Sequence, residues 1–116
     1  MLFLQYPPCS TCKKAKNWLD VHQISYTDRH IKENNPSYEE LKDWYQRSGL
    51  PLKRFFNTSG LLYKSLNLKD RLPNMTDEEQ LQLLASDGML VKRPLLITED
   101  RVLTGFQEAQ WTELLK

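Results

Sequence analysis

Two cysteines, Cys9 and Cys12, lie three positions apart where a short apolar segment gives way to an amphipathic one. The apolar segment, residues 2–6, ends at Pro7-Pro8, which predicts a buried strand that runs into a turn. In residues 10–21 apolar positions recur at helical spacing and charged positions take the opposite face, which predicts a helix with Cys9 at its N-terminus. A strand followed by a helix that begins at a Cys-x-x-Cys motif constrains the fold more than any other feature.

The middle of the chain predicts one more strand and then helices. Residues 24–28 alternate apolar with polar residues, as a strand does. Ser37 and Thr76 each precede a glutamate by three positions, which is the spacing of a capping box and predicts two helix starts. Residues 52–72, between these helices, are expected to form short helical turns.

A hairpin and a helix are predicted at the C-terminal end. Residues 95–104 have the pattern of two antiparallel strands, closed by Gly105, and residues 107–115 that of a helix. The order β-α-β, helices, β-β-α is that of a thioredoxin core with a helical insertion at about residues 36–90. We therefore expect an α/β, thioredoxin-like (glutaredoxin-like) fold with a four-stranded mixed sheet, in a single domain over residues 1–116.

Length and composition narrow the class of protein. With 116 residues, 40% of them hydrophobic and 27% charged, the sequence is typical of a globular domain. It has no run approaching the roughly 20 apolar residues of a membrane span and no basic region like that of a secretion signal, so a cytoplasmic location is expected. A net charge of +1 argues against direct binding to nucleic acid or membranes, although a small basic patch is not excluded.

The spacing of the cysteines suits redox chemistry. A pair this close closes too short a loop to stabilise the fold much, and a reducing compartment disfavours structural disulfides. At a helix N-terminus the free N–H groups and the macrodipole favour the Cys9 thiolate, and Lys13 and Lys14 add positive charge. Cys12 lies one turn further on, where it can attack a mixed disulfide formed at Cys9. We interpret Cys9 as a nucleophile and Cys12 as a resolving thiol.

Two other uses of the pair stay open on the residues alone. A Cys-x-x-Cys motif supplies half of a zinc site, but the chain has no second pair, and His22 and His30 lie at no familiar ligand spacing. We therefore expect no metal or other cofactor. Free cysteines are also common as small buried core residues.

Four separated segments resemble the arsenate-reductase-like family, which includes glutaredoxin-linked arsenate reductases and the Spx-type regulators of RNA polymerase. They occur in the family's order between about residues 2 and 115, and they are Tyr6–Ala15, Phe55–Gly60, Lys92–Leu96 and Gly105-Phe106. The resemblance implies a thioredoxin-like fold with a helical insertion. It also implies a cis Arg93-Pro94 bond that brings the guanidinium close to Cys9, where it would stabilise a thiolate or bind an oxyanion.

The chain departs from the glutaredoxin-linked reductases at the site. Their three arginines around the oxyanion align with Asn57, Arg93 and Gly105, and they have a serine in place of Cys12. Losing two charge-assisted contacts of roughly 1.5–3 kcal/mol each predicts poor arsenate reduction. The Spx-type regulators share the cysteine pair and the arginine-proline step.

We therefore expect a thiol–disulfide oxidoreductase in which Cys9 attacks, Cys12 resolves and Arg93 lowers the pKa of Cys9. The residues expected to bind substrate are Ser10, Thr11, Lys13, Asn57 and Pro94. The expected partner is a disulfide-bearing protein or a low-molecular-weight thiol, with glutaredoxin and thioredoxin as further candidates, and the protein is expected to be a monomer. The alternative is a Spx-like redox sensor that binds RNA polymerase or another protein.

Overall fold

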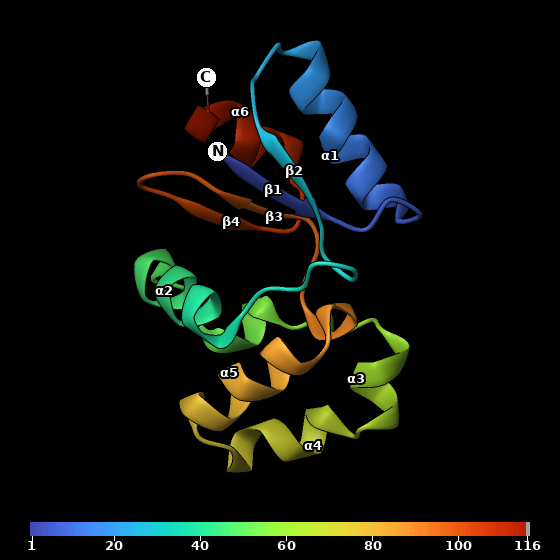
Figure 1. The fold of residues 1–116 in the computed structure, drawn as a ribbon, viewed down its shortest axis with the longest axis vertical. Coiled ribbons are helices and arrows are strands. Elements are labelled where there is room, and N and C mark those ends of the chain that lie inside the picture. The colour runs from blue at the N-terminus through green and yellow to red at the C-terminus, as the bar shows by residue number, and fades with distance from the viewer. Residues whose placement is uncertain (116) are drawn as a thin grey trace.

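A four-stranded sheet lies at the centre of the computed structural model, which describes residues 1–115 (Figure 1). Its strands, in the spatial order β2-β1-β3-β4, are β1 (Leu2–Gln5), β2 (Thr27–His30), β3 (Leu95–Ile97) and β4 (Val102–Thr104). β1 is parallel to β2 and antiparallel to β3, and β3 is antiparallel to β4. The mixed sheet of the predicted thioredoxin-like fold is confirmed.

Two helices, α1 (Ser10–Val21) and α6 (Glu108–Leu115), cover one face of this sheet (Figure 1). Side chains alternate between the two faces along a strand. Those that join the cluster under α1 and α6 are Phe3, Leu96 and Leu103. Trp111 of α6 is fully buried and meets Trp18 of α1 edge to face, at 5.7 Å between ring centroids. This packing fixes α1, and with it the cysteine motif, at the end of β1.

The second strand begins three residues later than the alternation of residues 24–28 predicts. Ile24 N donates to Leu19 O at 3.0 Å, so Ile24 closes the end of α1, and its side chain packs on the cluster under that helix together with Tyr26. Pairing with β1 begins where Thr27 N donates to Met1 O at 2.8 Å. The strand itself is polar because β2 is an edge strand with no buried side chain.

The helical insertion predicted at about residues 36–90 lies between β2 and β3. Its elements are α2 (Tyr38–Ser48), the 3₁₀ helix η1 (Leu52–Phe55), α3 (Leu61–Ser65), α4 (Leu68–Arg71), the 3₁₀ helix η2 (Leu72–Asn74), α5 (Asp77–Ser86) and the 3₁₀ helix η3 (Gly88–Leu90). Ser37 and Thr76 form the two predicted capping boxes. None of the helices in residues 1–115 is long and apolar enough to cross a membrane.

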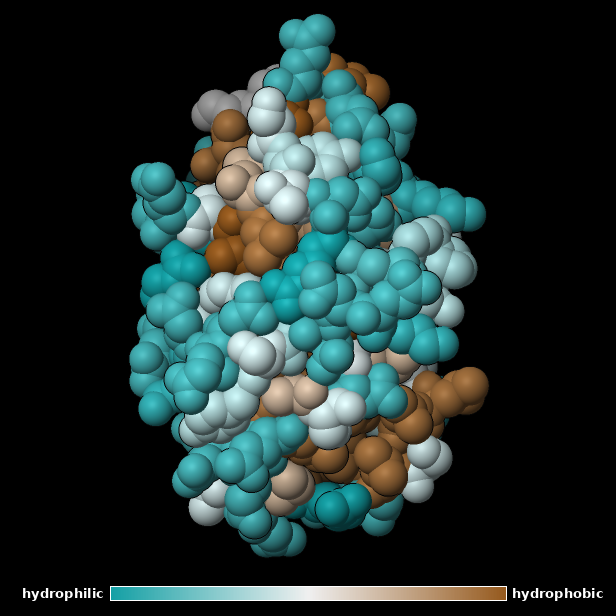
Figure 2. Space-filling view, viewed as in Figure 1, coloured by the Kyte–Doolittle hydropathy of each residue, from teal (hydrophilic) through white to brown (hydrophobic). Residues whose placement is uncertain are grey.

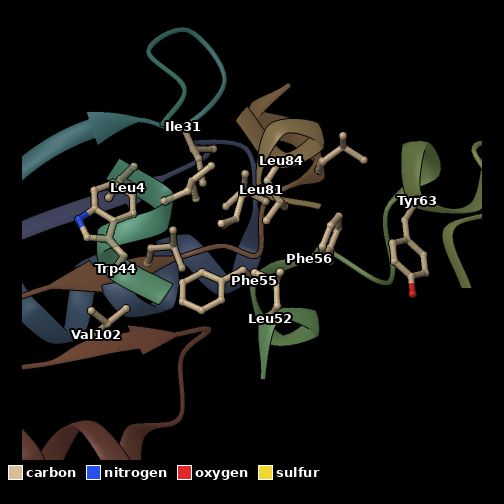
Figure 3. Close-up of a cluster of buried hydrophobic side chains, with 14 of the residues drawn as sticks. Leu4, Ile31, Trp44, Leu52, Phe55, Phe56, Tyr63, Leu81, Leu84 and Val102 are labelled. Carbon is tan, nitrogen blue, oxygen red and sulfur yellow. The ribbon is translucent and has the colours of Figure 1, made fainter. Parts of the chain in front are cut away.

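A second apolar cluster joins the insertion to the other face of the sheet (Figure 3). Leu4 and Val102 of the sheet meet Trp44 of α2 and Phe55 of η1, and the α5 leucines complete the cluster. Burying apolar surface stabilises by about 25 cal/mol per Å². The insertion is therefore part of the same folded core as the sheet that carries the cysteines. On the face shown in Figure 2, apolar side chains of the insertion gather near α3 and α4, and Leu61 of α3 is 86% exposed.

Polar and backbone contacts also join the two parts where β2 leads into α2. Arg29 of β2 forms a bidentate ion pair with Glu40 in the first turn of α2, at 2.7 and 2.9 Å. Gly88 of η3 lies against Ile31, and a Cβ atom at position 88 would be 1.8 Å from the Ile31 carbonyl oxygen. Only glycine allows this approach of one backbone to another.

Candidate active site at the start of helix α1

Cys9 is the residue at which α1 begins. Its backbone is extended (φ −73°, ψ 126°), and its N–H donates to Tyr6 O at 2.9 Å across the Pro7-Pro8 turn. The Cys9 side chain forms no capping hydrogen bond, but the nearby N–H groups of Cys12 and Thr11 lower the pKa of its thiol. As the sequence predicts, this sulfur lies at the positive end of a helix.

Cys12 lies one turn further along α1 and is completely buried, whereas Cys9 is half-buried. Tyr6 N donates to Cys12 Sγ at 3.4 Å, and the Cys12 thiol is close enough to the Cys9 sulfur to lower the pKa of Cys9. Both cysteines are free thiols. The two sulfurs are therefore neighbours, and Cys9 is the one that is open to a reactant.

The pKa values of the two thiols move in opposite directions. Burial raises the pKa of Cys12 to about 12, and the hydrogen bond from Tyr6 N–H offsets this only in part. Partial burial also raises the pKa of Cys9, but hydrogen bonds from Cys12, Arg93 and Thr11 outweigh it and hold that pKa below its ordinary value. Since the thiolate is the nucleophile, these opposite shifts favour Cys9 over Cys12 as the attacking sulfur, and the assignment of roles stays a prediction.

Arg93 is held beside Cys9 by the loop that precedes β3. The Arg93-Pro94 peptide bond is cis, as the resemblance implies, and Pro94 is buried. The guanidinium lies over the Tyr6 ring, with Arg93 Cζ 5.0 Å from the ring centroid, and its Nη1 donates to Met89 Sδ at 3.9 Å. It is close enough to Cys9 to lower the pKa of that thiol. Tyr6 thus contacts both cysteines through its backbone and Arg93 through its ring. Sequence reasoning treated Tyr6 only as the end of a strand.

Cys9 opens onto a groove of about 900 Å³. Of the residues predicted for the site, those that line this groove are Cys9, Thr11, Asn57 and Arg93. Ser10 and Lys13 are exposed on α1 and do not line it, because successive residues of a helix point in different directions. Pro94, which is buried, does not line it either. The roles expected of these three residues stay predictions.

The two groove positions that the resemblance assigns to arginine hold Asn57 and Gly105. The Asn57 amide folds over its own loop, so that a Cβ atom at Gly60 would lie 2.7 Å from Asn57 Nδ2. Gly105 has a φ of 73°, and a Cβ atom there would lie 3.1 Å from Lys92 Cε and 3.9 Å from Lys92 Nζ. The Lys92 ammonium therefore lies where the glycine leaves space.

Sequence reasoning missed the cations of this groove other than Arg93. Lys92 adjoins the Arg93-Pro94 step, and that adjacency is the signal that was available. Lys53 and Arg54 reach the groove from η1, and Arg101 reaches it from the turn between β3 and β4. A single sequence contains no signal that connects these distant segments with Cys9.

The histidines are engaged locally, away from the thiols. His22 Nδ1 lies 2.8 Å from Trp18 O, and His30 Nδ1 accepts from the backbone N–H of Lys32 and of Glu33. Over residues 1–115, no three His, Cys, Asp or Glu side chains are grouped so that they could hold a metal ion. The geometry around Cys9 is that of a thiol pair with cationic neighbours.

Comparison with known proteins identifies the family. The ArsC family model matches residues 4–114. The chain belongs to the ArsC family. Its fold closely matches the crystal structure of an ArsC family related protein from Bacteroides fragilis, with a TM-score of 0.94 and 59% identity over 97% of this chain and 95% of that one.

Relatives of this ArsC-family chain include regulators. It is 54% identical to protein YusI of Bacillus subtilis over 97% of this chain and 96% of that one. It is 32% identical to the regulatory protein MgsR of Bacillus subtilis over 100% of this chain and 90% of that one. The chain is thus a member of a thioredoxin-fold family that contains both ArsC-type and regulatory proteins.

Proposed function

We propose that this ArsC-family chain is a thiol–disulfide oxidoreductase in which Cys9 is the nucleophile and Cys12 the resolving thiol. The observation that carries the proposal is the contrast between two adjacent sulfurs. Cys9 opens onto the groove with a lowered pKa, and Cys12 is buried behind it with a pKa raised to about 12. In a pair of inert core cysteines, both thiols would be buried and protonated, so they would not differ in exposure and pKa in this way.

The proposed reaction transfers two electrons from the dithiol to a substrate disulfide. The Cys9 thiolate attacks one substrate sulfur, forms a mixed disulfide and releases the other sulfur as a thiolate. That thiolate takes the proton from Cys12, whose sulfur then attacks Cys9 Sγ. The second substrate thiol leaves, and the Cys9–Cys12 disulfide remains. A low-molecular-weight or protein dithiol then reduces this disulfide and restores both thiols.

Arg93 and the N–H groups of the first helical turn stabilise the Cys9 thiolate that begins this cycle. When Cys12 attacks Cys9 Sγ, Cys9 is the central sulfur and the second substrate sulfur is the leaving group. The buried position of Cys12 keeps it protonated until the mixed disulfide has formed. This division of roles is the reason to prefer disulfide exchange over reduction of arsenate, for which Asn57 and Gly105 offer no charged donor.

Counting released thiols tests the proposal. Reduced protein, freed of excess reductant, is mixed with hydroxyethyl disulfide, and mercaptoethanol and intact protein mass are measured. Wild type should release two thiols per chain, Cys12→Ser should release one and gain one hydroxyethylthio group, and Cys9→Ser should release none. The proposal is refuted if wild type releases no thiol, and the roles are reversed if Cys12→Ser is inert while Cys9→Ser forms the adduct.

A second candidate function is redox-controlled binding to a protein, supported by the 32% identity to the regulatory protein MgsR along the whole chain. Formation of the Cys9–Cys12 disulfide would then change a docking surface for RNA polymerase or another protein. Size-exclusion chromatography of the oxidised and reduced chain with RNA polymerase separates the candidates. Comigration of the oxidised form alone favours the regulator, and slow thiol release in the assay above would strengthen that conclusion.

A further inference from the structure

The groove in front of Cys9 is lined by many more basic than acidic residues, although the two kinds are nearly balanced in the whole sequence. The sequence has 16 Lys and Arg residues against 15 Asp and Glu residues. Among the described residues, the acidic residue that lines the groove is Asp100, whereas the basic ones are Arg47, Lys53, Arg54, Lys92, Arg93 and Arg101. We call the space between these six side chains the cationic groove. A net charge close to zero therefore conceals a strongly uneven distribution.

Most of these cations have no acidic partner. Arg47 pairs with Asp43 at 3.1 Å and donates to the carbonyls of Thr98 and Glu99, so it secures the turn between β3 and β4. Asp100 accepts a hydrogen bond from Thr98 Oγ1 at 3.1 Å. In the part of the chain that the structure describes, the other five cations form no ion pair. Arg93 faces Cys9 and the Tyr6 ring, and the charges of the other four are available to a ligand.

The cationic groove is larger than an oxyanion requires. Its volume of about 900 Å³ is roughly thirty times the share of one water molecule in the liquid. A tetrahedral oxyanion at Cys9 would fill a small part of it and leave the cations of η1 and of the β3–β4 turn unused. The remaining lining is rich in uncharged hydrogen-bonding side chains, namely Thr11, Thr58, Ser59, Thr104, Gln107 and Gln110. Such side chains suit the amide groups of a peptide.

We propose that the cationic groove binds an acidic peptide segment, so that the substrate is a disulfide whose cysteine is flanked by Asp or Glu residues. This inference rests on the proposed disulfide exchange at Cys9 and adds the substrate class. The cations attract such a segment toward Cys9 and repel a basic one. Complementary charge raises the rate of encounter more than it changes the chemistry that follows.

A peptide fits the groove better than a nucleic acid does. Sites for single-stranded nucleic acid stack bases on exposed aromatic rings. The aromatic residues that line the groove are Phe56 and Phe106, and Phe56 is 1% exposed while Phe106 is half-buried. The groove also contains the Cys9 sulfur. A cysteine-containing peptide has a sulfur that can exchange with it, whereas a nucleic acid has none.

Three peptides of equal length test the inference. Each contains one cysteine as a mixed disulfide with mercaptoethanol, flanked on both sides by glutamate, glutamine or lysine. The single-turnover rate of exchange is measured at several NaCl concentrations. We expect the glutamate peptide to react about tenfold or more faster than the glutamine peptide at low salt, and the lysine peptide to be slowest. The differences should shrink toward 1 M NaCl, where the screening length is about 3 Å.

Charge variants locate the effect. Lys53→Gln combined with Arg54→Gln should lower the ratio of the glutamate rate to the glutamine rate. The matched control is Lys42→Gln combined with Lys69→Gln, which removes two exposed lysines outside the groove and should leave the ratio unchanged. An equal fall in both double variants would mean that net charge, and not the groove, sets the preference, and would overturn the inference.

The outcomes separate this inference from the proposed function. Equal rates for all three peptides would contradict the binding of acidic segments in the cationic groove and would leave disulfide exchange supported. If none of the peptides exchanged, the proposed function would be wrong. Binding of a cysteine-free glutamate peptide, measured by fluorescence anisotropy, tests the groove independently of exchange. If a single-stranded oligonucleotide of the same charge binds as tightly as that peptide, the assignment to an acidic peptide is wrong.

Discussion

The sheet with α1 and α6 differs from the helical insertion in what it gives to the site. The sheet part supplies the sulfur chemistry: Cys9 and Cys12 at the start of α1 and the cis Arg93-Pro94 bond before β3. The insertion adds further cations and part of the groove wall, with Lys53 and Arg54 on η1 and Asn57 on the loop that follows. With this arrangement, changes in the insertion can alter which substrates reach the thiol without altering the reactivity of the thiol.

The insertion and the sheet should unfold together, because they share one apolar cluster. Phe55 is fully buried in the cluster that contains both insertion and sheet residues, so Phe55→Ala should cost about 3–5 kcal/mol. Its matched variant on the other face, Leu19→Ala, should cost about 2–5 kcal/mol. Urea unfolding, followed by circular dichroism and by modification of Cys12, should give one transition in both variants. Two transitions in Phe55→Ala alone would show that the insertion unfolds independently.

The backbone contact between Gly88 and Ile31 joins the insertion to the strand end after β2. Gly88→Ala places a Cβ atom 1.8 Å from the Ile31 carbonyl oxygen and should cost about 1–3 kcal/mol, because the two parts must move apart. Gly49→Ala is the control: it has open space but a φ of 67°, and should cost about 1–2 kcal/mol. Equilibrium unfolding measures both. If Gly88→Ala is as stable as wild type, the contact does not join the two parts.

The ion pair between β2 and α2 should make the smallest contribution. Hydrogen bonds from Arg29 lower the pKa of Glu40 to about 2. Because this value lies below that of the unfolded chain, the stabilisation is present above about pH 4.5 and is lost as pH falls toward about 2. Glu40 is 36% exposed, so Glu40→Gln should cost only about 1 kcal/mol near neutral pH.

Unfolding free energies measured against pH check this prediction. The difference between wild type and Glu40→Gln should vanish near pH 2. A difference that persists at low pH would mean that the loss comes from helix capping rather than from charge.

Local signals in the sequence predicted the elements around the thiols. They could not predict contacts between distant segments of the chain. The β1–α1 turn and both capping boxes depend on residues within a few positions, which is why Cys9, Ser37 and Thr76 lie where they were predicted. The second strand was misplaced because Ile24 and Tyr26 are apolar for packing against the cluster under α1, not for pairing in the sheet. The cationic groove joins four distant segments, so no local pattern could predict it, and the cis bond was predicted from family resemblance alone.

The central claim is that Cys9 and Cys12 are chemically different sulfurs. It is tested most directly by the rate of alkylation with iodoacetamide against pH, measured on Cys12→Ser, which retains Cys9, and on Cys9→Ser, which retains Cys12. Cys9 should reach its half-maximal rate below the pH of an ordinary thiol, since its pKa is lowered, whereas Cys12 should stay unreactive at neutral pH because burial raises its pKa to about 12. If Cys12 is the faster thiol near neutrality, the assignment of nucleophile and resolving thiol is contradicted.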